Sequence, residues 1–323
     1  MHDSTTSRLV LSLCKAILQR FHLKLAACIN NTLNARFKET LSSSFKMYLR
    51  PIHAEHDIPT LRSLVHETQL GILITAFDPT GTSSDRQLHS THIPWVLHVD
   101  DPQSETELGV LQGHMARQNP QAKLLVELAN SKANKNDNDD GVIEEQDVMV
   151  LFTAPQNAYI SPSFYTSTKP ATGKVVPTWD YASVAAYGKI RVYAQGEEGT
   201  GDFLDEQVDK LTRESEAKHL QSRSQNGDQD DEHQEGWKVS DAPTPYINVL
   251  KRAIIGIEIK ITRLEGKWKM SQEISEGDRK GVVEGLERRD MELGMEMGGR
   301  GVGKIVEERG EVEMQKKEAE GKV

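Results

Sequence analysis

The most regular pattern in the chain is an alternation of apolar and polar residues near its end. Within residues 254–264, Ile257, Ile259 and Ile261 alternate with charged or hydroxyl side chains. This pattern is typical of a strand with one buried face. Shorter runs with a similar bias occur at 71–77, 92–99, 108–113, 148–153 and 158–160, and residues 174–193 are expected to hold one or two long strands. We therefore expect a core built mostly of β-strands.

Two helices are predicted by their start signals. Asp57 is placed to cap a helix that has a proline in its first turn, and apolar residues then repeat at helical spacing. The Asn119–Pro120 pair predicts a second helix that runs through residue 128. Many short strands with few helices favour a barrel or sandwich over a parallel sheet, so the expected fold class is mainly β with peripheral helices (α+β).

Strongly polar segments divide the chain. Residues 130–147 are rich in Asn, Asp and Lys, and residues 213–236 are rich in Gln, Asp, Glu and Ser. Neither segment has enough apolar surface to offset the entropy cost of ordering it, so both are predicted to be surface insertions. The Gly-, Glu- and Lys-rich residues 287–323 are predicted to be a disordered or fraying helical tail. The folded domain is expected at 47–286.

Residues 1–46 are basic, whereas the whole chain has a net charge of -10. One interpretation of this N-terminal extension is a mitochondrial transit peptide, which would place the protein in mitochondria. The other is an unconstrained extension, or an upstream start codon with Met47 as the true first residue. In that case we expect a cytoplasmic protein, with the nucleus as a further option.

Composition excludes several classes of function. Both cysteines lie in the extension, so thiol catalysis, thiolate zinc sites and disulfide scaffolds are excluded from the main body. No apolar run approaches the roughly 18 residues that cross a bilayer, which argues against a membrane protein. The net negative charge removes the simplest argument for DNA binding. No helix-turn-helix pattern is evident, although direct nucleic-acid binding stays open.

Two local motifs resemble known sites but lack the necessary context. Residues 298–304 match most of a phosphate-binding P-loop, yet Ile305 stands where a Ser or Thr is needed, and no buried strand precedes the motif. His-x-x-His pairs at 53–56 and 89–92 have no third ligand at useful spacing. We expect hydrogen-bonded or surface histidines there, and no metal site.

Four other blocks contain the groups that a phosphate-bearing aromatic cofactor needs. They lie at residues 92–94, 113–120, 159–181 and 264–272. In the second block, a histidine and an arginine stand at a strand-to-helix junction, where cations and backbone amides can converge on a phosphate. The other blocks add hydroxyl donors, aromatic rings that could line a flat ring system, and lysines.

Plainer interpretations of the same residues stay open. A lone histidine such as His114 is more often a hydrogen-bonded structural residue than a ligand. Only 6% of the residues are aromatic, so the local group at 159–181 could be core or a dimer interface. Lys267 and Lys269 would also suit the solvated side of an edge strand.

Together the blocks resemble the PaiB family of flavin-binding proteins, which is named after a bacterial negative regulator of protease synthesis and sporulation. The family's landmarks are similar to Met-Tyr-Leu-Arg-Pro at 47–51, to the blocks at 113–120, 159–181 and 264–272, and to Trp-Lys-Val-Ser-Asp-Ala-Pro at 237–243. The resemblance covers about 47–286. The insertions and terminal extensions depart from the compact family pattern and suggest a fungal-type member.

The resemblance implies a six-stranded split β-barrel of the pyridoxamine-phosphate-oxidase type. It also implies a homodimer with flavin mononucleotide (FMN) sites between the subunits. His114, Arg117 and Asn119 become candidates for the flavin phosphate, and the fourth block would reach the site from the partner subunit. The predicted cofactor-binding residues are His92, His114, Arg117, Asn119, Ser161, Tyr165, Lys174, Thr178, Trp179, Tyr181, Lys267, Trp268, Lys269, Ser271 and Gln272.

Three functions follow from this resemblance. The first is a PaiB-like FMN-binding negative regulator of transcription that acts indirectly. The second is a flavin-dependent oxidoreductase, although no catalytic residue stands out and enzyme activity stays undecided. The third is a haem-binding split-barrel protein with His92 or His114 as the iron ligand.

Overall fold

The computed structural model describes residues 47–77, 87–133, 142–194, 196, 199–225, 235–293 and 299–321. All elements below belong to the compact unit Leu49–Val323. The predicted extension at 1–46 lies outside the described residues, as do 134–141 and 226–234 within the two predicted insertions.

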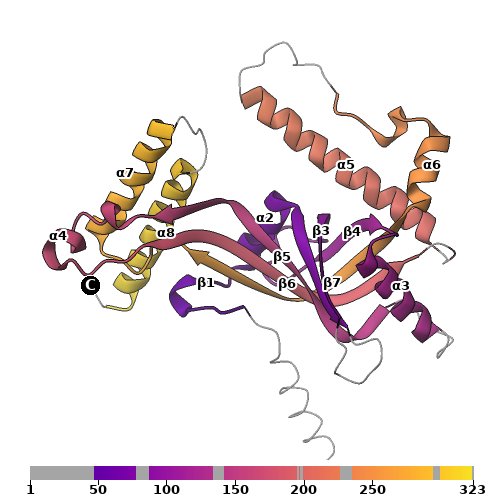
Figure 1. The fold of residues 1–323 in the computed structure, drawn as a ribbon, viewed down its shortest axis with the longest axis horizontal. Helices are drawn as coiled ribbons and strands as arrows, with labels where there is room; N and C mark the ends of the chain where they lie inside the picture. Colours follow the sequence, from indigo (N-terminus) through magenta and orange to yellow (C-terminus); the bar gives the residue numbers. More distant parts are fainter. Residues whose placement is uncertain are drawn as a thin grey trace, which may run out of the picture. The chain divides into compact units, whose positions relative to one another are not determined.

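Within the described residues, one seven-stranded antiparallel sheet closes on itself (Figure 1). The strands follow the order β1 (Ala54–Glu55), β7 (Ile254–Lys269), β4 (Val110–Ala116), β3 (Gln87–His98), β2 (Leu70–Phe77), β5 (Val142–Ile160) and β6 (Thr178–Tyr193). Because β6 also pairs with β7, the strands from β2 to β7 form a six-stranded barrel, and β1 adds to one side of β7. The predicted fold class is confirmed.

The alternation of residue types explains which face of each strand is buried. Ile257 and Ile259 of β7 are fully buried, whereas Lys260 between Ile259 and Ile261 is exposed. In β2, every second side chain from Gly71 to Phe77 is buried. Apolar side chains from all six barrel strands fill the interior, which is the arrangement that a small closed barrel requires.

Both predicted helix starts are confirmed. Helix α2 (Ile58–Thr68) begins after Asp57, whose carboxylate accepts a hydrogen bond from the Thr60 backbone N–H at 2.9 Å. Helix α3 (Pro120–Ala133) begins after Asn119. Its residues Ala122 and Leu125 are fully buried, so α3 packs its apolar stripe against the barrel.

The predicted insertions contain more regular structure than their composition suggests. Helix α5 (Thr200–Gln225) extends through the first half of 213–236, and β5 begins inside 130–147. Ile143 is fully buried and pairs with Ile190 of β6, so the end of that segment belongs to the barrel. Helix α5 is rich in Glu, Lys, Gln and Leu, which have high helix propensity.

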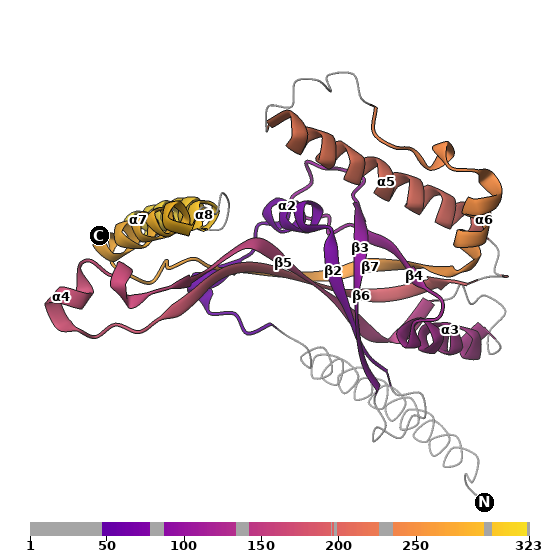
Figure 2. The same ribbon diagram turned by 45° about the horizontal axis from the view of Figure 1, so that its top comes forward.

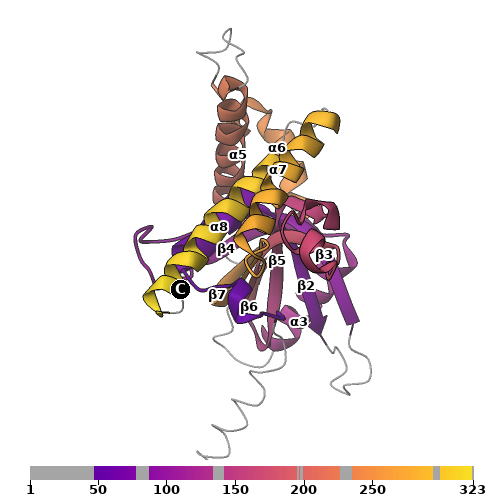
Figure 3. The same cartoon turned by 90° about the vertical axis from the view of Figure 1, so that its left-hand side faces the viewer.

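The predicted tail at 287–323 is helical where the structure describes it. Helices α7 (Glu276–Leu293) and α8 (Gly299–Ala319) pack side by side, as Figures 2 and 3 show. Val282, Leu286, Val302 and Val306 are fully buried. The apolar residues are few, but their spacing of four places them on one face of each helix. Residues 299–304 of the P-loop-like run lie inside α8.

The polypeptide between β5 and β6 projects as a two-stranded extension. Residues 157–181, which we call the arm, comprise the paired outer ends of β5 and β6, the short helix η2 (Pro162–Phe164) and helix α4 (Thr168–Thr172). In Figures 1 and 2 the arm runs to the left, whereas α5 and α6 (Thr244–Arg252) lie toward the other end of β6. No described helix is long and apolar enough to span a bilayer.

Candidate functional site

The first group of predicted site residues lies where β4 leads into α3. The half-buried His114 on β4 contacts Gln207 of α5, with 2.6 Å between His114 Nδ1 and Gln207 Oε1. Since the amide oxygen can only accept, Nδ1 donates. Gln207 is buried, and its Nε2 has no hydrogen-bond partner in the structure. A buried N–H without an acceptor costs about 1–3 kcal/mol, so an oxygen atom of a ligand would stabilise this position.

The same junction contains Arg117 and Asn119. The backbone N–H of Arg117 donates to the carbonyl of Ala253, the residue that ends α6, at 2.9 Å. Asn119 Oδ1 accepts from the Gln121 backbone N–H at 2.9 Å, and its Nδ2 donates to Thr91 Oγ1 at 3.0 Å. The Asn119 side chain therefore acts as the cap of α3. His92 lies one residue beyond Thr91 on β3 and is exposed.

The second group lies on the arm and the adjacent end of β7. Tyr181 pairs in register with Lys269. Lys269 Nζ donates to Thr178 Oγ1 at 2.6 Å and to the Trp179 carbonyl at 3.0 Å. Lys267 Nζ lies 5.3 Å from the centre of the Tyr181 ring, within range of a cation–π contact. β6 and β7 thus bring four of the predicted residues together with Tyr181.

A buried carboxyl group, missed by the sequence prediction, lies within this second group. Asp180 is fully buried, accepts a hydrogen bond from Ser271 Oγ at 2.6 Å, and lies 3.4 Å from Lys269 Nζ. Burial raises the pKa of Asp180 to about 6, partly opposed by the hydrogen bond from Ser271 and the charge of Lys269. No sequence signal identified Asp180, because alternation along β6 does not by itself show which face of the strand is buried.

Several predicted site residues have structural roles in the fold. Trp268 and Tyr165 are buried, and burial raises the pKa of the Tyr165 hydroxyl. Gln272 Oε1 accepts from the Met270 backbone N–H at 2.7 Å, so it fixes the turn after β7. Ser161 caps η2 by accepting from the Ser163 N–H.

One exposed part of the arm is aromatic. Tyr159 and Trp179 are directly opposite each other on β5 and β6, with ring centres 6.0 Å apart in an edge-to-face arrangement. Their exposed fractions are 45% and 49%, and neighbouring Val176 is 73% exposed. Lys174 is exposed as well. This surface is suited to contact a flat ring or another protein chain.

The two groups lie at opposite ends of β6. Tyr181 pairs with Lys269 at one end, whereas at the other end Tyr193 pairs with Gly256, which pairs with His114. At roughly 3.3 Å per residue, the strand path from Tyr181 to Tyr193 is about 40 Å. One FMN molecule cannot span this distance. A single subunit therefore does not bring all the predicted residues to one cofactor.

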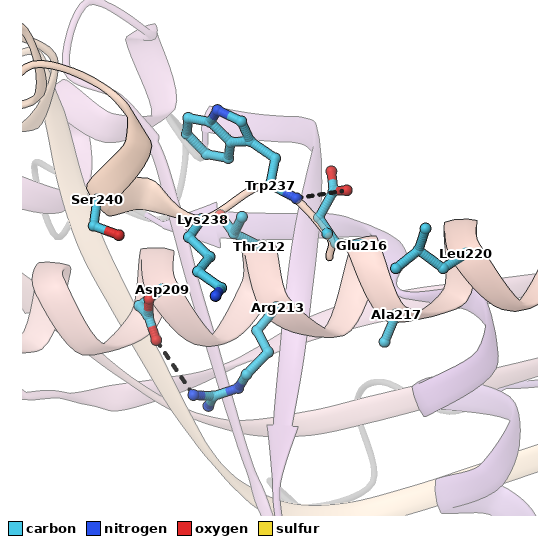
Figure 4. A pocket seen from close by; sticks show the side chains of 10 residues that line it. Asp209, Thr212, Arg213, Glu216, Ala217, Leu220, Trp237, Lys238 and Ser240 are labelled. Carbon is cyan, nitrogen blue, oxygen red and sulfur yellow. Dashed lines mark hydrogen bonds and ion pairs between the residues drawn. The ribbon is translucent and has the colours of Figure 1, made fainter. Parts of the chain in front are cut away.

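The described residues also line two hollows outside these groups. A groove of about 420 Å³ lies between α5 and the segment 236–240, and Figure 4 shows the side chains that line it. There the Trp237 backbone N–H donates to Glu216 Oε2 at 3.2 Å. A second hollow of about 340 Å³ lies between α2, the barrel and α8. Among the predicted site residues, Trp268 lines it.

No cluster of described residues has the composition of a metal site.

Comparison with known proteins places this geometry in a family. Residues 47–263 match a family model whose description reads "Putative FMN-binding domain". The chain is 45% identical over 277 residues to an uncharacterised protein of Aspergillus fumigatus, covering 84% of this chain and 100% of that protein. It is 23% identical over 245 residues to "Protease synthase and sporulation protein PAI 2" of Bacillus subtilis, covering 76% and 91%.

Among solved structures, the flavocytochrome Anf3 from Azotobacter vinelandii is similar over 72% of this chain and 78% of its own, with 10% identity and a TM-score of 0.33. A likeness of this size supports no functional comparison. The family match and the fold define a split-barrel flavoprotein of the PaiB type. The chain belongs to this FMN-binding family, and its cofactor is FMN.

The chemistry of the side chains fits FMN. Arg117 and the start of α3 provide a cation and amide donors for a phosphate beside His114, and Gln207 Nε2, which has no partner among the described residues, adds a further donor. The arm provides the Tyr159–Trp179 pair, and the adjacent end of β7 provides Lys269, for a flat ring with polar edges. When bound, FMN supplies hydride and single-electron transfer.

Proposed function

We propose that the protein is an FMN-dependent regulator, that it works as a homodimer, and that it influences transcription without reading DNA itself. The division of the predicted FMN residues between the two ends of β6 carries the proposal for a dimer. Because one FMN cannot contact both His114 and Lys269 of the same chain, a site that uses both groups needs two chains. A two-fold dimer supplies two such sites.

The regulatory role is supported by the likeness to the Bacillus subtilis protein, whose name refers to protease synthesis and sporulation. The indirect mode of action is supported by charge. The chain carries -10 overall, and phosphate neutralisation by a basic face is the usual basis of DNA affinity. In the described residues, α2 is followed directly by β2, so it is not the first helix of a helix-turn-helix unit.

Complementation between two inactive variants tests the composite site. Arg117→Ala and Trp179→Ala remove one group each, and we expect either variant alone to lose FMN binding. In a co-expressed equal mixture, half of the dimers are mixed and each mixed dimer has one intact site, so about a quarter of the sites should bind FMN. Bound flavin per chain, measured by absorbance after desalting, is the readout.

If the mixture binds no more FMN than the separate variants, the site is not shared between chains and the dimeric part of the proposal fails. Sedimentation of the wild type provides a second check, because the proposal requires a dimer at the concentration used for the flavin assay.

The absorption spectrum and DNA binding of the purified protein test the rest of the proposal. We expect the two absorption bands of oxidised flavin, and no sequence-selective shift of promoter fragments in a gel assay over a range of salt concentrations. A Soret band in place of flavin bands would establish the haem alternative. A salt-sensitive, sequence-selective shift by the pure protein would overturn indirect action.

Asp180 supports a second candidate function, a flavin-dependent oxidoreductase. A buried carboxyl group with a pKa of about 6 can hold or release a proton near neutral pH, and Lys269 connects it to the surface where the flavin ring is expected. Anaerobic mixing with NADH or NADPH checks this function. If neither reductant bleaches the bound flavin, oxidoreductase activity with NADH or NADPH is excluded. The regulator is then the remaining proposed function.

A further inference from the structure

Helix α5 has two different faces, and one of them forms a groove that is separate from the FMN residues. Toward the barrel unit, Lys210 Nζ lies 3.2 Å from His98 Nδ1 of β3, and Glu214 accepts a hydrogen bond from Gln69 at 3.3 Å. The groove-lining residues within 209–220 lie on the opposite side of the helix. Among the described residues that line the groove, none is a predicted FMN residue.

The second wall of the groove is the segment 236–240, which is held closely against α5 at one end. The Trp237 backbone N–H donates to Glu216 Oε2 at 3.2 Å, and a Cβ on Gly236 would lie 2.8 Å from the Cβ of Glu216. These contacts fix both walls relative to each other. The groove, of about 420 Å³, is therefore pre-formed and has the size of a small-molecule site.

One end of the groove is apolar. Ala217 and Leu220 line α5 at the end away from Ser240, as Figure 4 shows. From the other wall the indole ring of Trp237 projects away from α5, and this side chain is 47% exposed. A half-exposed indole beside aliphatic side chains gains free energy when an apolar group of a ligand covers it.

The other end of the groove is charged, with both signs present. On α5, Arg213 Nη1 lies 3.3 Å from Asp209 Oδ2, and the two side chains are 69% and 55% exposed. On the opposite wall, Lys238 pairs with Glu235, and both side chains are exposed. Exposed ion pairs contribute about 1 kcal/mol or less, so charged groups of a ligand can take the place of either partner.

We infer that the groove binds a small zwitterion with a large apolar side chain, which is the chemistry of a free amino acid or a short peptide. Its side chain lies against Trp237 and Leu220. Its carboxylate is bound by Arg213 and Lys238, and its ammonium group by Asp209. An anion alone would leave Asp209 unsatisfied, and a cation alone would be repelled by Arg213. A zwitterion is the class that satisfies both signs.

The part of α5 that follows residue 212 belongs to the 213–236 insertion, which departs from the compact family pattern. The site is therefore built in part from sequence outside that pattern. It requires neither FMN nor a second chain, so it can be tested independently of the proposed function.

Calorimetric titration of the full-length protein, as purified, tests the inference with three related compounds. L-phenylalanine is the zwitterion, phenethylamine lacks its carboxylate, and 3-phenylpropanoate lacks its ammonium group. We expect phenylalanine to bind roughly tenfold more tightly than either of the others, because each lost group removes a charge-assisted hydrogen bond. Titration with phenylalanyl-leucine then shows whether the free amino acid or the peptide is preferred, and tight binding of either supports the inference.

Neutral replacements of the charged residues distinguish a ligand site from a structural role. Arg213→Gln/Lys238→Gln should remove the preference for phenylalanine over phenethylamine and keep the preference over 3-phenylpropanoate. Asp209→Asn should have the reverse effect. A folding defect would weaken all three compounds alike. Arg252→Gln, which removes an exposed cation of α6 outside the groove, is the matched control and should change neither preference.

The inference is overturned if phenylalanine does not bind, or if one of the singly charged compounds binds as tightly as phenylalanine. It is also overturned if the groove variants do not change the preferences, or if Arg252→Gln changes them equally. The flavin absorbance of the same samples reports separately on the proposed function. Flavin without phenylalanine binding leaves the proposed function standing, whereas phenylalanine binding by a protein that never takes up FMN refutes the proposed function alone.

Discussion

At the scale of single residues, Asp180 links the site to pH. Burial raises its pKa from 3.8 to about 6 in the folded protein, whereas the unfolded chain keeps the ordinary value. Between these two pH values the folded state holds a proton that the unfolded state releases. The wild type therefore gains stability as the pH falls through 6, and this gain is complete below about 4.

Replacing Asp180 with Asn removes this titration. Because a shift of one pKa unit corresponds to 1.36 kcal/mol, the wild type should gain about 2.4 kcal/mol of unfolding free energy relative to Asp180→Asn between pH 7.5 and pH 4. Urea unfolding of both proteins at each pH measures the difference, and contributions from all other groups cancel in it. A difference that does not change with pH would show that Asp180 has the same pKa in the folded and the unfolded protein, and would contradict the effect of burial.

Asn119 gives a second prediction at this scale. Its side chain caps α3 and donates to Thr91, so Asn119→Ala should lower the unfolding free energy by about 1 kcal/mol. Asn119→Asp keeps the capping oxygen and should recover most of the loss. Denaturant unfolding is the measurement. If Asn119→Ala is as stable as the wild type and loses FMN, the residue is a cofactor ligand and not a cap.

At the scale of elements, the docked pair of α7 and α8 is the main difference from the prediction. Val302 and Val306 of α8 are fully buried, and the Arg309 guanidinium lies 4.7 Å from the centre of the Trp268 ring and pairs with Glu55. Helix α8 therefore contacts the end of β7 that carries Lys267 and Lys269. Helix α7, in turn, holds the arm through Asp278.

Limited proteolysis distinguishes a docked α8 from a disordered tail. Lys304 and Arg309 should resist trypsin in the wild type, because cleavage requires local unfolding. Val306→Asp buries a carboxylate without a partner and should increase cleavage at these positions on the order of 10- to 100-fold. Val312→Asp is the matched control, since Val312 lies on the same helix but is 41% exposed. Equal cleavage of wild type and Val306→Asp would contradict docking.

The sequence predicts the elements with strong local signals and misses those that depend on a few contacts. Alternation predicts β7, and the Asp57 signal predicts the start of α2. The composition of 287–323 suggests disorder because its two buried valines, Val302 and Val306, do not change an average. Asp180 was missed for a related reason: a lone Asp in an aromatic block has no motif, and only the barrel shows that it is buried.

At the scale of the whole molecule, the proposed composite site links FMN binding to dimerisation. FMN bound between two chains stabilises the dimer, so the dissociation constant of the dimer should be lower with FMN than without it. Sedimentation equilibrium with and without FMN measures both constants. Equal constants would contradict a site that is shared between chains.

The candidate site also shows which features of a site shared between two chains can be predicted from one sequence. The family resemblance identified residues at both ends of β6, but spacing along the chain does not show that a single strand separates them. Only the register of β6 with β7 and of β7 with β4 places His114 and Lys269 at opposite ends. The need for a second chain is thus a consequence of topology, which local patterns do not contain.

The closure of the barrel by β7 has a consequence for synthesis on the ribosome. β7 pairs with β1, β4 and β6, and it is the last strand among the described residues. Until residue 254 has left the ribosome, β4 and β6 both have unpaired edges, and such edges readily pair with other chains. A nascent chain, or one terminated before β7, is therefore the aggregation-prone form of this protein, and the time spent translating α5 and α6 prolongs its exposure.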